Sequence, residues 1–134
     1  MIEALIFPDA RDALFDLING STHLGETVSA FYELPADTYG AIKGPYPIAL
    51  IYTTGGTKGF LDRVDRATIE VYAPGQQAVN TLESIAASII GTDIETPSGH
   101  LDGIEQDAVP TDVPYQSDTL NRATMTLLVT SRPL

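Results

Sequence analysis

The chain has 134 residues, is 43% hydrophobic, and carries eighteen acidic against seven basic side chains, for a net charge of −11. This length fits one domain, residues 1–134, which buries roughly two-thirds of the surface that the unfolded chain exposes. The absence of cysteine excludes disulfides, thiolate metal sites and cysteine nucleophiles. No stretch approaches the ~20 apolar residues that span a bilayer, so no membrane partner is expected.

The first predicted element is a helix that begins near Pro8 and ends at Gly20. Pro suits a first helical turn, and Asp9 and Asp12 suit the positive end of the helix dipole. Apolar residues then recur at helical spacing: Ala10, Ala13, Leu14, Leu17 and Ile18.

Two strands and a hairpin tip are predicted next. The β-prone segment Thr27 to Glu33 is followed by Asp37 to Pro47, which is rich in Gly and Pro and predicts an exposed connection. Ile48 to Tyr52 is apolar on both faces, which is typical of a central strand. The Gly-rich residues Thr53 to Asp62 indicate the tip of a long hairpin.

The stretch Arg63 to Gly91 predicts a strand, a sharp turn and a helix. Alternating apolar residues from Ala67 to Ala73 indicate a half-buried strand that ends at Pro74-Gly75. The period then becomes helical, with Gly91 expected as a left-handed C-cap. The predicted apolar stripe of this helix is Ala78, Val79, Leu82, Ile85, Ala86, Ile89 and Ile90.

The last third of the chain predicts a polar loop, a short edge strand, an irregular segment and a final strand, namely Thr92 to Asp102, Gly103 to Val109, Pro110 to Asp118 and Thr119 to Arg132. Glu105 and Asp107 are expected to face out from the edge strand. The order α-β-β-β-α-β-β predicts an α+β fold, with a mostly antiparallel sheet of about five strands and both helices packed on one face.

Motifs that carry chemistry are weak or absent. His23 and His100 lie in Gly- and Ser-containing segments and are expected to be solvated, although a site assembled in three dimensions from His, Asp and Glu stays open. Gly55 to Gly59 contains Lys58 but lacks the Gly-Lys-Ser/Thr order of a phosphate-binding loop. We therefore expect no catalytic, cofactor-binding or metal-binding residues, and a binding or assembly module rather than an enzyme.

The acidic side chains are unevenly distributed. Between Arg66 and Arg122 there is no Lys or Arg, while nine acidic residues fall there. Such a field repels DNA, so sequence-specific contact is not expected. The charge alone favours a role in solubility, and the other interpretation is a surface that DNA slides past without sticking.

The segment from Pro47 to Arg132 resembles the tail terminator (tail completion) proteins of long-tailed bacteriophages. The resemblance is carried by Pro-Ile-Ala-Leu-Ile-Tyr, the Gly-rich tip, the run Asp62 to Pro74 and the amphipathic helix. The end of the chain is similar as well, through Val113-Pro114-Tyr115, Asp118, Leu120, Arg122 and Arg132. It covers about two-thirds of the chain and includes no catalytic motif, and the loops Asp37 to Pro47 and Thr92 to Asp102 have no matching residues.

This resemblance implies a virion protein of the tail or neck, assembled in the host cytoplasm. Such proteins form a ring, usually of six subunits, that caps the tail tube, ends its growth and joins tail to head through connector proteins, with a lumen for DNA. The implied subunit or tube interface is Gly55, Gly56, Thr57, Lys58, Gly59, Phe60, Arg66, Thr68, Glu70 and Tyr72. The implied lumen lining is Asp93, Glu95, Asp102, Glu105 and Asp107.

Two other functions remain open on the sequence. The chain could be a head-completion or connector adaptor of similar size, on the portal side of the joint. It could instead be a small ligand-binding or hydrolytic domain of a bacterial cytoplasm, which would need a closed pocket with convergent polar groups.

Overall fold

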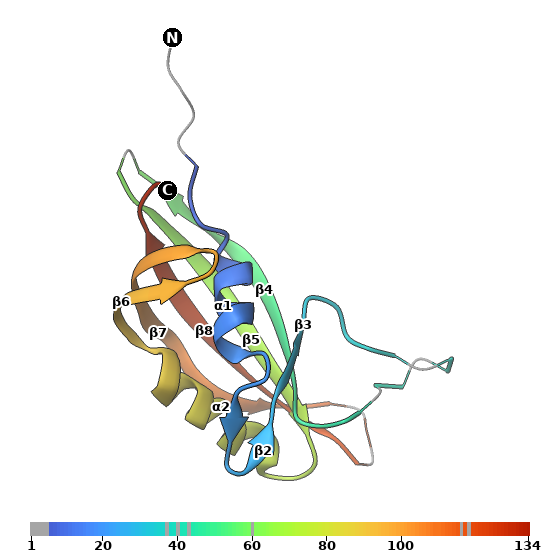
Figure 1. Ribbon diagram of the computed structural model, residues 1–134. Coiled ribbons are helices and arrows are strands. Elements are labelled where there is room, and N and C mark those ends of the chain that lie inside the picture. Colours follow the sequence, from blue (N-terminus) through green and yellow to red (C-terminus); the bar gives the residue numbers. More distant parts are fainter. Residues whose placement is uncertain are drawn as a thin grey trace.

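Figure 1 shows the computed structural model, which describes residues 6–36, 38–39, 41–42, 44–59, 61–115, 117 and 119–134. Within these residues the fold is α+β, with two helices, a curled mixed sheet of six strands and a small sheet of two. The elements are α1 (Ala10–Ile18), β1 (Thr22–His23), β2 (Glu26–Thr27), β3 (Ser29–Phe31), β4 (Ile48–Lys58), β5 (Arg63–Ala73), α2 (Gln77–Ile89), β6 (Gly91–Thr96), β7 (Gly99–Val113) and β8 (Asn121–Ser131).

Helix α1 begins at Ala10, two residues after Pro8. Asp9 is the N-cap, and its Oδ1 accepts hydrogen bonds from the backbone N–H groups of Arg11 and Asp12. Pro8 therefore precedes the helix rather than forming its first turn. The cap satisfies backbone donors that have no partner within the helix, which fixes where α1 starts.

The segment predicted as one strand from Thr27 to Glu33 forms parts of two sheets. Strand β2 pairs with β1 in the small antiparallel sheet, and β3 pairs in parallel with the start of β4, with Ser29 opposite Ile48. Backbone hydrogen bonds between Ser21 and Val28 and between Gly20 and Val28 turn the chain at this point. The single-strand expectation was wrong because the turn interrupts it.

The large sheet has the order β3-β4-β5-β8-β7-β6, and all of its neighbouring pairs except β3–β4 are antiparallel. Strand β5 pairs in unbroken register with β8, from Arg63 opposite Ser131 to Ala73 opposite Asn121. On its other side it pairs with β4, where the register shifts between Thr53 and Gly56. The Gly-rich segment is thus mostly strand, since β4 continues to Lys58.

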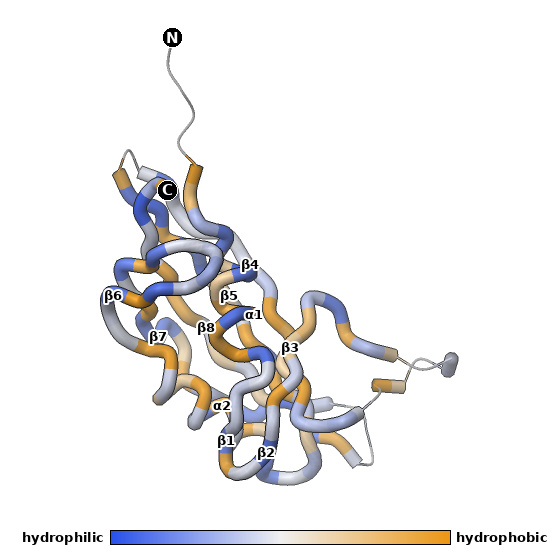
Figure 2. The backbone as a smooth tube through the Cα atoms, in the orientation of Figure 1, coloured by the Kyte–Doolittle hydropathy of each residue, from blue (hydrophilic) through white to orange (hydrophobic). Residues whose placement is uncertain are grey.

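Both helices pack against one face of this sheet, and Figure 1 shows them on the same side. The apolar core between them is continuous, and Figure 2 shows the hydrophobic stretches of the strands running beneath the helices. The sheet contributes alternating residues of β4, β5 and β8 to this core: Ala49, Ile51, Ala67, Ile69, Val71, Ala73, Ala123, Met125, Leu127 and Val129. The helices contribute Ala10, Ala13, Leu14, Ile18, Ala78, Leu82, Ile85, Ala86 and Ile89.

The segment predicted as a polar loop, Thr92 to Asp102, is instead most of a strand pair. The chain leaves α2 through Ile90, which has extended backbone (φ −71°, ψ 129°), and enters β6 at once, so Gly91 is not a left-handed cap. Strand β6 pairs with β7 from Gly91 opposite Ile104 to Thr96 opposite Gly99. Hydrogen bonds between β6 and β7 satisfy the backbone N–H and C=O groups of this segment. Its polar side chains alone did not indicate that pairing.

Strand β7 is also longer than predicted. It runs through Pro110 to Val113, in a segment expected to be irregular. The register against β8 shifts between Gln106 and Ala108 and again between Ala108 and Thr111. Such irregularities accommodate a proline that cannot donate to the ladder.

The fold predicts that Leu82→Ala, in the core-facing stripe of α2, lowers the free energy of unfolding by about 2–5 kcal/mol, because it leaves a cavity at a fully buried site. Urea unfolding of the purified chain measures this loss. Glu83→Ala, one residue along on the exposed face of the helix, is the matched control and changes stability by about 0.5 kcal/mol or less. Equal losses in the two variants would contradict this assignment of the core.

Candidate functional site

The hairpin of β4 and β5 is the first predicted interface to consider. From Thr53 to Lys58 every residue of β4 is exposed, and β3 pairs with β4 only over Ile48–Leu50. No other strand of the described chain pairs with this edge, so its outward N–H and C=O groups lack a strand partner there. Phe60, the predicted interface anchor, lies outside the described residues.

Two glycines shape this end of β4. Gly55 has φ +110° and open space where a side chain would begin, whereas Gly56 has φ +151° and lies tightly against β5. A Cβ at Gly56 would come within 2.0 Å of the Val64 carbonyl oxygen. The glycine at position 56 is therefore required by a close approach of backbone as well as by its dihedral angle.

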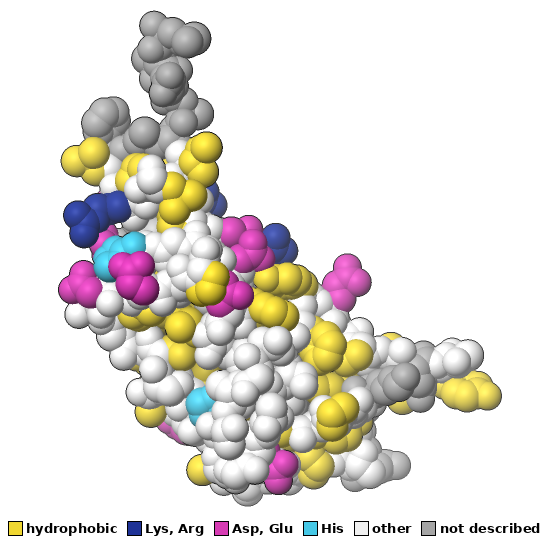
Figure 3. All heavy atoms as spheres, viewed as in Figure 1, with side chains coloured by type: hydrophobic (Ala, Val, Ile, Leu, Met, Phe, Trp, Pro, Cys, Tyr) yellow, Lys and Arg dark blue, Asp and Glu magenta, His cyan; other side chains and the backbone are white. Residues whose placement is uncertain are grey.

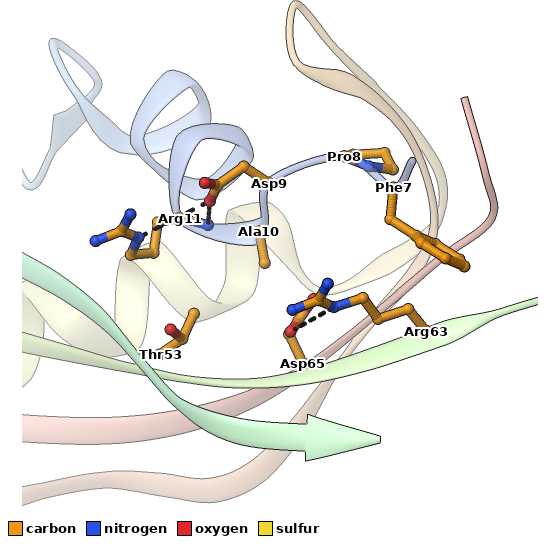
Figure 4. Close-up of a pocket in the computed structure, with 8 residues that line it drawn as sticks. All are labelled: Phe7, Pro8, Asp9, Ala10, Arg11, Thr53, Arg63 and Asp65. Carbon is orange, nitrogen blue, oxygen red and sulfur yellow. Dashed lines mark hydrogen bonds and ion pairs between the residues drawn. The ribbon is translucent and has the colours of Figure 1, made fainter. Parts of the chain in front are cut away.

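A hollow of about 310 Å³ lies between the start of α1 and this hairpin. Figure 4 shows Arg63 turned toward Asp65, and their Nε and Oδ1 atoms are 3.0 Å apart. Asp65 is buried, which is consistent with its being paired. On the opposite wall, the Nε atom of Arg11 lies 3.9 Å from Oδ1 of Asp9. The charges around the hollow are thus already engaged within the chain.

The outer face of β5 carries a hydrogen-bonded cluster centred on Glu70. The hydroxyls of Tyr52 and Tyr72 each donate to one of its carboxylate oxygens at 2.7 Å. Burial, followed by the hydrogen bond to Glu70, raises the pKa of Tyr52 to about 12, and the same causes raise the pKa of Tyr72 further. Both tyrosines therefore remain protonated donors at neutral pH.

Tyr72 does not contribute free surface to the predicted interface. It is only 2% exposed, because the ring of Tyr115 packs edge-on against it at 5.2 Å between centroids. Arg122 lies over Tyr115 in turn and donates to the Pro114 carbonyl oxygen. The outer face of β5 is thus covered at Tyr72 by a loop of the same chain.

The other predicted outer-face residues differ from one another. Arg66 is exposed, and its Nε donates to Asp107 at 3.2 Å, so it links β5 to a predicted lumen residue across β8. Thr68 is half-buried. Glu105 is exposed on β7, as expected for an outward-facing residue.

The remaining predicted lumen residues converge on His100. Asp93 and Glu95 on β6 and Asp102 on β7 all lie within 3.8 Å of its ring nitrogens. Figure 3 shows this gathering of acidic side chains around a histidine at the β6–β7 end of the molecule. Hydrogen bonding to Glu95 and the charges nearby raise the pKa of His100.

The side chains of this cluster were not expected to meet, because the segment Thr92 to Asp102 was predicted to be a loop. The turn signal Thr96-Pro97-Ser98-Gly99 was available, since Pro and Gly mark turns. A hairpin centred there places Glu95 opposite His100. Recognising that hairpin would have predicted the pair.

His23 is not solvated either. It is buried, its Nδ1 lies 2.8 Å from Ser84 Oγ on α2, and its Nε2 lies 2.9 Å from Ser21 Oγ. Because the Ser21 hydroxyl donates to the Ile18 carbonyl, it accepts from Nε2–H, and Nδ1 accepts from Ser84. Burial lowers the pKa of His23, so the neutral ring attaches the small sheet to α2.

The described residues include no group of three or more His, Cys, Asp or Glu side chains arranged to hold a metal ion. Neither described helix is long and apolar enough to cross a membrane. The chain matches no protein-family model, and no curated protein is detectably similar to it.

The hairpin geometry predicts different costs for its two glycines. Gly55→Ala bears only backbone strain of about 1–3 kcal/mol, because nothing lies near the added methyl group. Gly56→Ala costs more, since its methyl group collides with β5. Urea unfolding compares the two free energies directly. A Gly56→Ala protein as stable as Gly55→Ala would show that β4 does not approach β5 in this way.

Proposed function

We propose that this chain is a structural virion protein of a long-tailed bacteriophage, a tail terminator whose subunits form a ring at the end of the tail tube. The ring ends tube growth, joins tail to head and leaves a lumen for DNA. The observation that carries this proposal is the long β4–β5 hairpin. Its strand β4 is exposed from Thr53 to Lys58, and beyond Leu50 no strand of the described chain pairs with the outer edge of β4.

An open strand edge is a template for pairing with another chain. In this hairpin the edge is rich in Thr and Gly and carries one charge, Lys58, whose ammonium lies over the ring of Phe7 at 5.3 Å. It therefore offers main-chain donors and acceptors with little side-chain charge to oppose a neighbour. A neighbouring subunit or the tube beneath is the partner that the proposal assigns to it.

The acidic side chains of β6 and β7 are compatible with a surface along which DNA passes. Asp93, Glu95 and Glu105 are exposed on β6 and β7, at the opposite side of the sheet from β4. A neighbour bound at the β4 edge would leave this flank uncovered. Negative charge on such a surface repels phosphates and so prevents DNA from adhering.

A head-completion or connector adaptor would use the same surfaces at a different place, on the portal side of the joint. A ligand-binding or hydrolytic domain is less well supported. The hollow beside α1 contains two arginines, Arg11 and Arg63, that are already paired with aspartates. The assembly role therefore remains the proposal.

The assembly test uses a variant that lacks Gly55 to Gly59. The monomer should fold, because the apolar core lies away from the tip. Binding to purified tail tubes should weaken by about tenfold or more, since that ratio corresponds to a lost contact of about 1.4 kcal/mol. Sedimentation with tubes and negative-stain imaging measure the loss.

Leu24→Ser is the control for this experiment, because Leu24 is exposed in the β1–β2 turn, away from the hairpin. It should bind tubes like the unaltered chain. An unaltered chain that stays monomeric and does not associate with tubes would overturn the proposed function. If loss of the gene gave leaky heads instead of overlong tails, the adaptor role would replace it.

Glu105→Lys tests the lumen assignment. This exposed residue should tolerate the change with little effect on unfolding, whereas a lysine at the lumen surface attracts phosphates and slows DNA passage. Infectivity and DNA ejection measure the effect. Asp107 is less suitable for this test, because its reversal also removes the ion pair with Arg66. Unchanged ejection by Glu105→Lys would remove this residue from the lumen.

A further inference from the structure

The edge strand β6 is joined to β7 by more than its backbone ladder. His100 on β7 faces Glu95 on β6, with Nδ1 and Oε1 2.5 Å apart. Its other nitrogen, Nε2, faces Asp93 Oδ1 at 3.5 Å and Asp102 Oδ1 at 3.8 Å. One imidazole thus lies between two carboxylates of β6 and one of β7.

A protonated imidazole reduces the net negative charge at this place, where three carboxylates otherwise face Arg132 alone. Arg132 donates to Asp102 at 2.9 Å, so among the described residues His100 is the cation paired with Asp93 and Glu95. Asp93 and Asp102 also lie between the residue pairs Thr92–Gly103 and Ile94–Leu101, on opposing strands. Like charges facing each other across an antiparallel pair are destabilising.

We propose that His100 is a pH-dependent clasp that holds the edge strand β6 on β7. The imidazolium bridges carboxylates of both strands and offsets their repulsion. When the ring loses its proton, Asp93, Glu95 and Asp102 repel one another across the pair, and β6 separates from Gly99–Ile104 more often.

The elements around the clasp make this opening local. Helix α1 reaches the turn through Asp16, which accepts a hydrogen bond from Ser98 Oγ at 3.0 Å. Gly99 lies against the side chains of Pro8 and Leu134. Glu105, further along β7, adds negative charge and no compensating cation. The turn thus remains anchored at one end while the paired part of β6 loosens.

The direction of the pH effect follows from the direction in which the fold shifts the pKa of His100. Neighbouring carboxylates raise the pKa of His100 above that of the unfolded chain, about 6.5. The contribution of His100 to the stability of the folded chain is therefore fully present below about pH 6.5. It is lost as pH rises through the raised pKa of His100. His23 acts in the opposite direction, because burial lowers its pKa and its contribution is lost as pH falls. A residue-resolved measurement is needed to separate the two.

Opening would change what the sheet offers to other molecules. Strand β6 covers the outer edge of β7 over Gly99–Ile104. Once β6 separates, those backbone groups form an open edge that another strand can pair with. The clasp thereby makes access to this edge dependent on pH, whether or not the chain caps a tail tube.

The test is an NMR titration of both histidines in the full chain, combined with hydrogen exchange of the β6 and β7 amides between about pH 5.5 and pH 8.5. We expect His100 to titrate above 6.5, and the protection of the β6 amides to fall about two- to fivefold in step with it, as for a lost exposed ion pair. His100→Gln should show the weaker protection at every pH.

Glu95→Gln should lower the pKa of His100. Glu26→Gln is the matched control, because it removes an exposed carboxylate from the β1–β2 sheet at the other end of the molecule (Figure 1) and should leave that pKa unchanged. The proposal is overturned if His100 titrates at or below 6.5, or if β6 protection follows the same course with pH in His100→Gln as in the unaltered chain.

Discussion

The apolar layer between the sheet and the two helices is the constraint on which the rest of the structure depends. Strand β5 lies at its centre, paired along its length with β8 and over most of it with β4. Its inner face from Ala67 to Ala73 is fully buried, and each large apolar side chain in such a layer contributes about 1.5–3 kcal/mol. Because β5 is held from both sides and from one face, it is the fixed base from which the hairpin and the outer strands extend.

The outer face of the same strand is polar but largely satisfied by its own chain. Glu70 accepts from Tyr52 and Tyr72, and the loop that carries Tyr115 covers Tyr72. Buried polar groups are stable when their hydrogen bonds are made, so this face can be covered without a partner.

The segments of β7 and β4 that lack an outer strand partner differ in charge and in regularity. Beyond Ile104, where β6 no longer pairs with it, β7 carries Glu105 and Asp107, contains Pro110 and departs twice from regular register. These features discourage pairing with other strands. The edge of β4 from Thr53 to Lys58 has one charge and one register shift. This contrast makes the edge of β4 the more accessible of the two for pairing with another strand.

The sequence by itself determined the elements whose side chains repeat with a clear period, namely α1, α2, β5 and β8, because the buried face of such an element selects the pattern. It also indicated the long hairpin and the uneven charge. Only the tertiary structure decided that Thr92 to Asp102 is a strand pair, since polar side chains carry no period there and the pairing depends on backbone hydrogen bonds. The burial of Tyr72 and His23 was decided by segments distant in sequence that the fold brings together, whereas the cluster at His100 depends on the local β6–β7 hairpin.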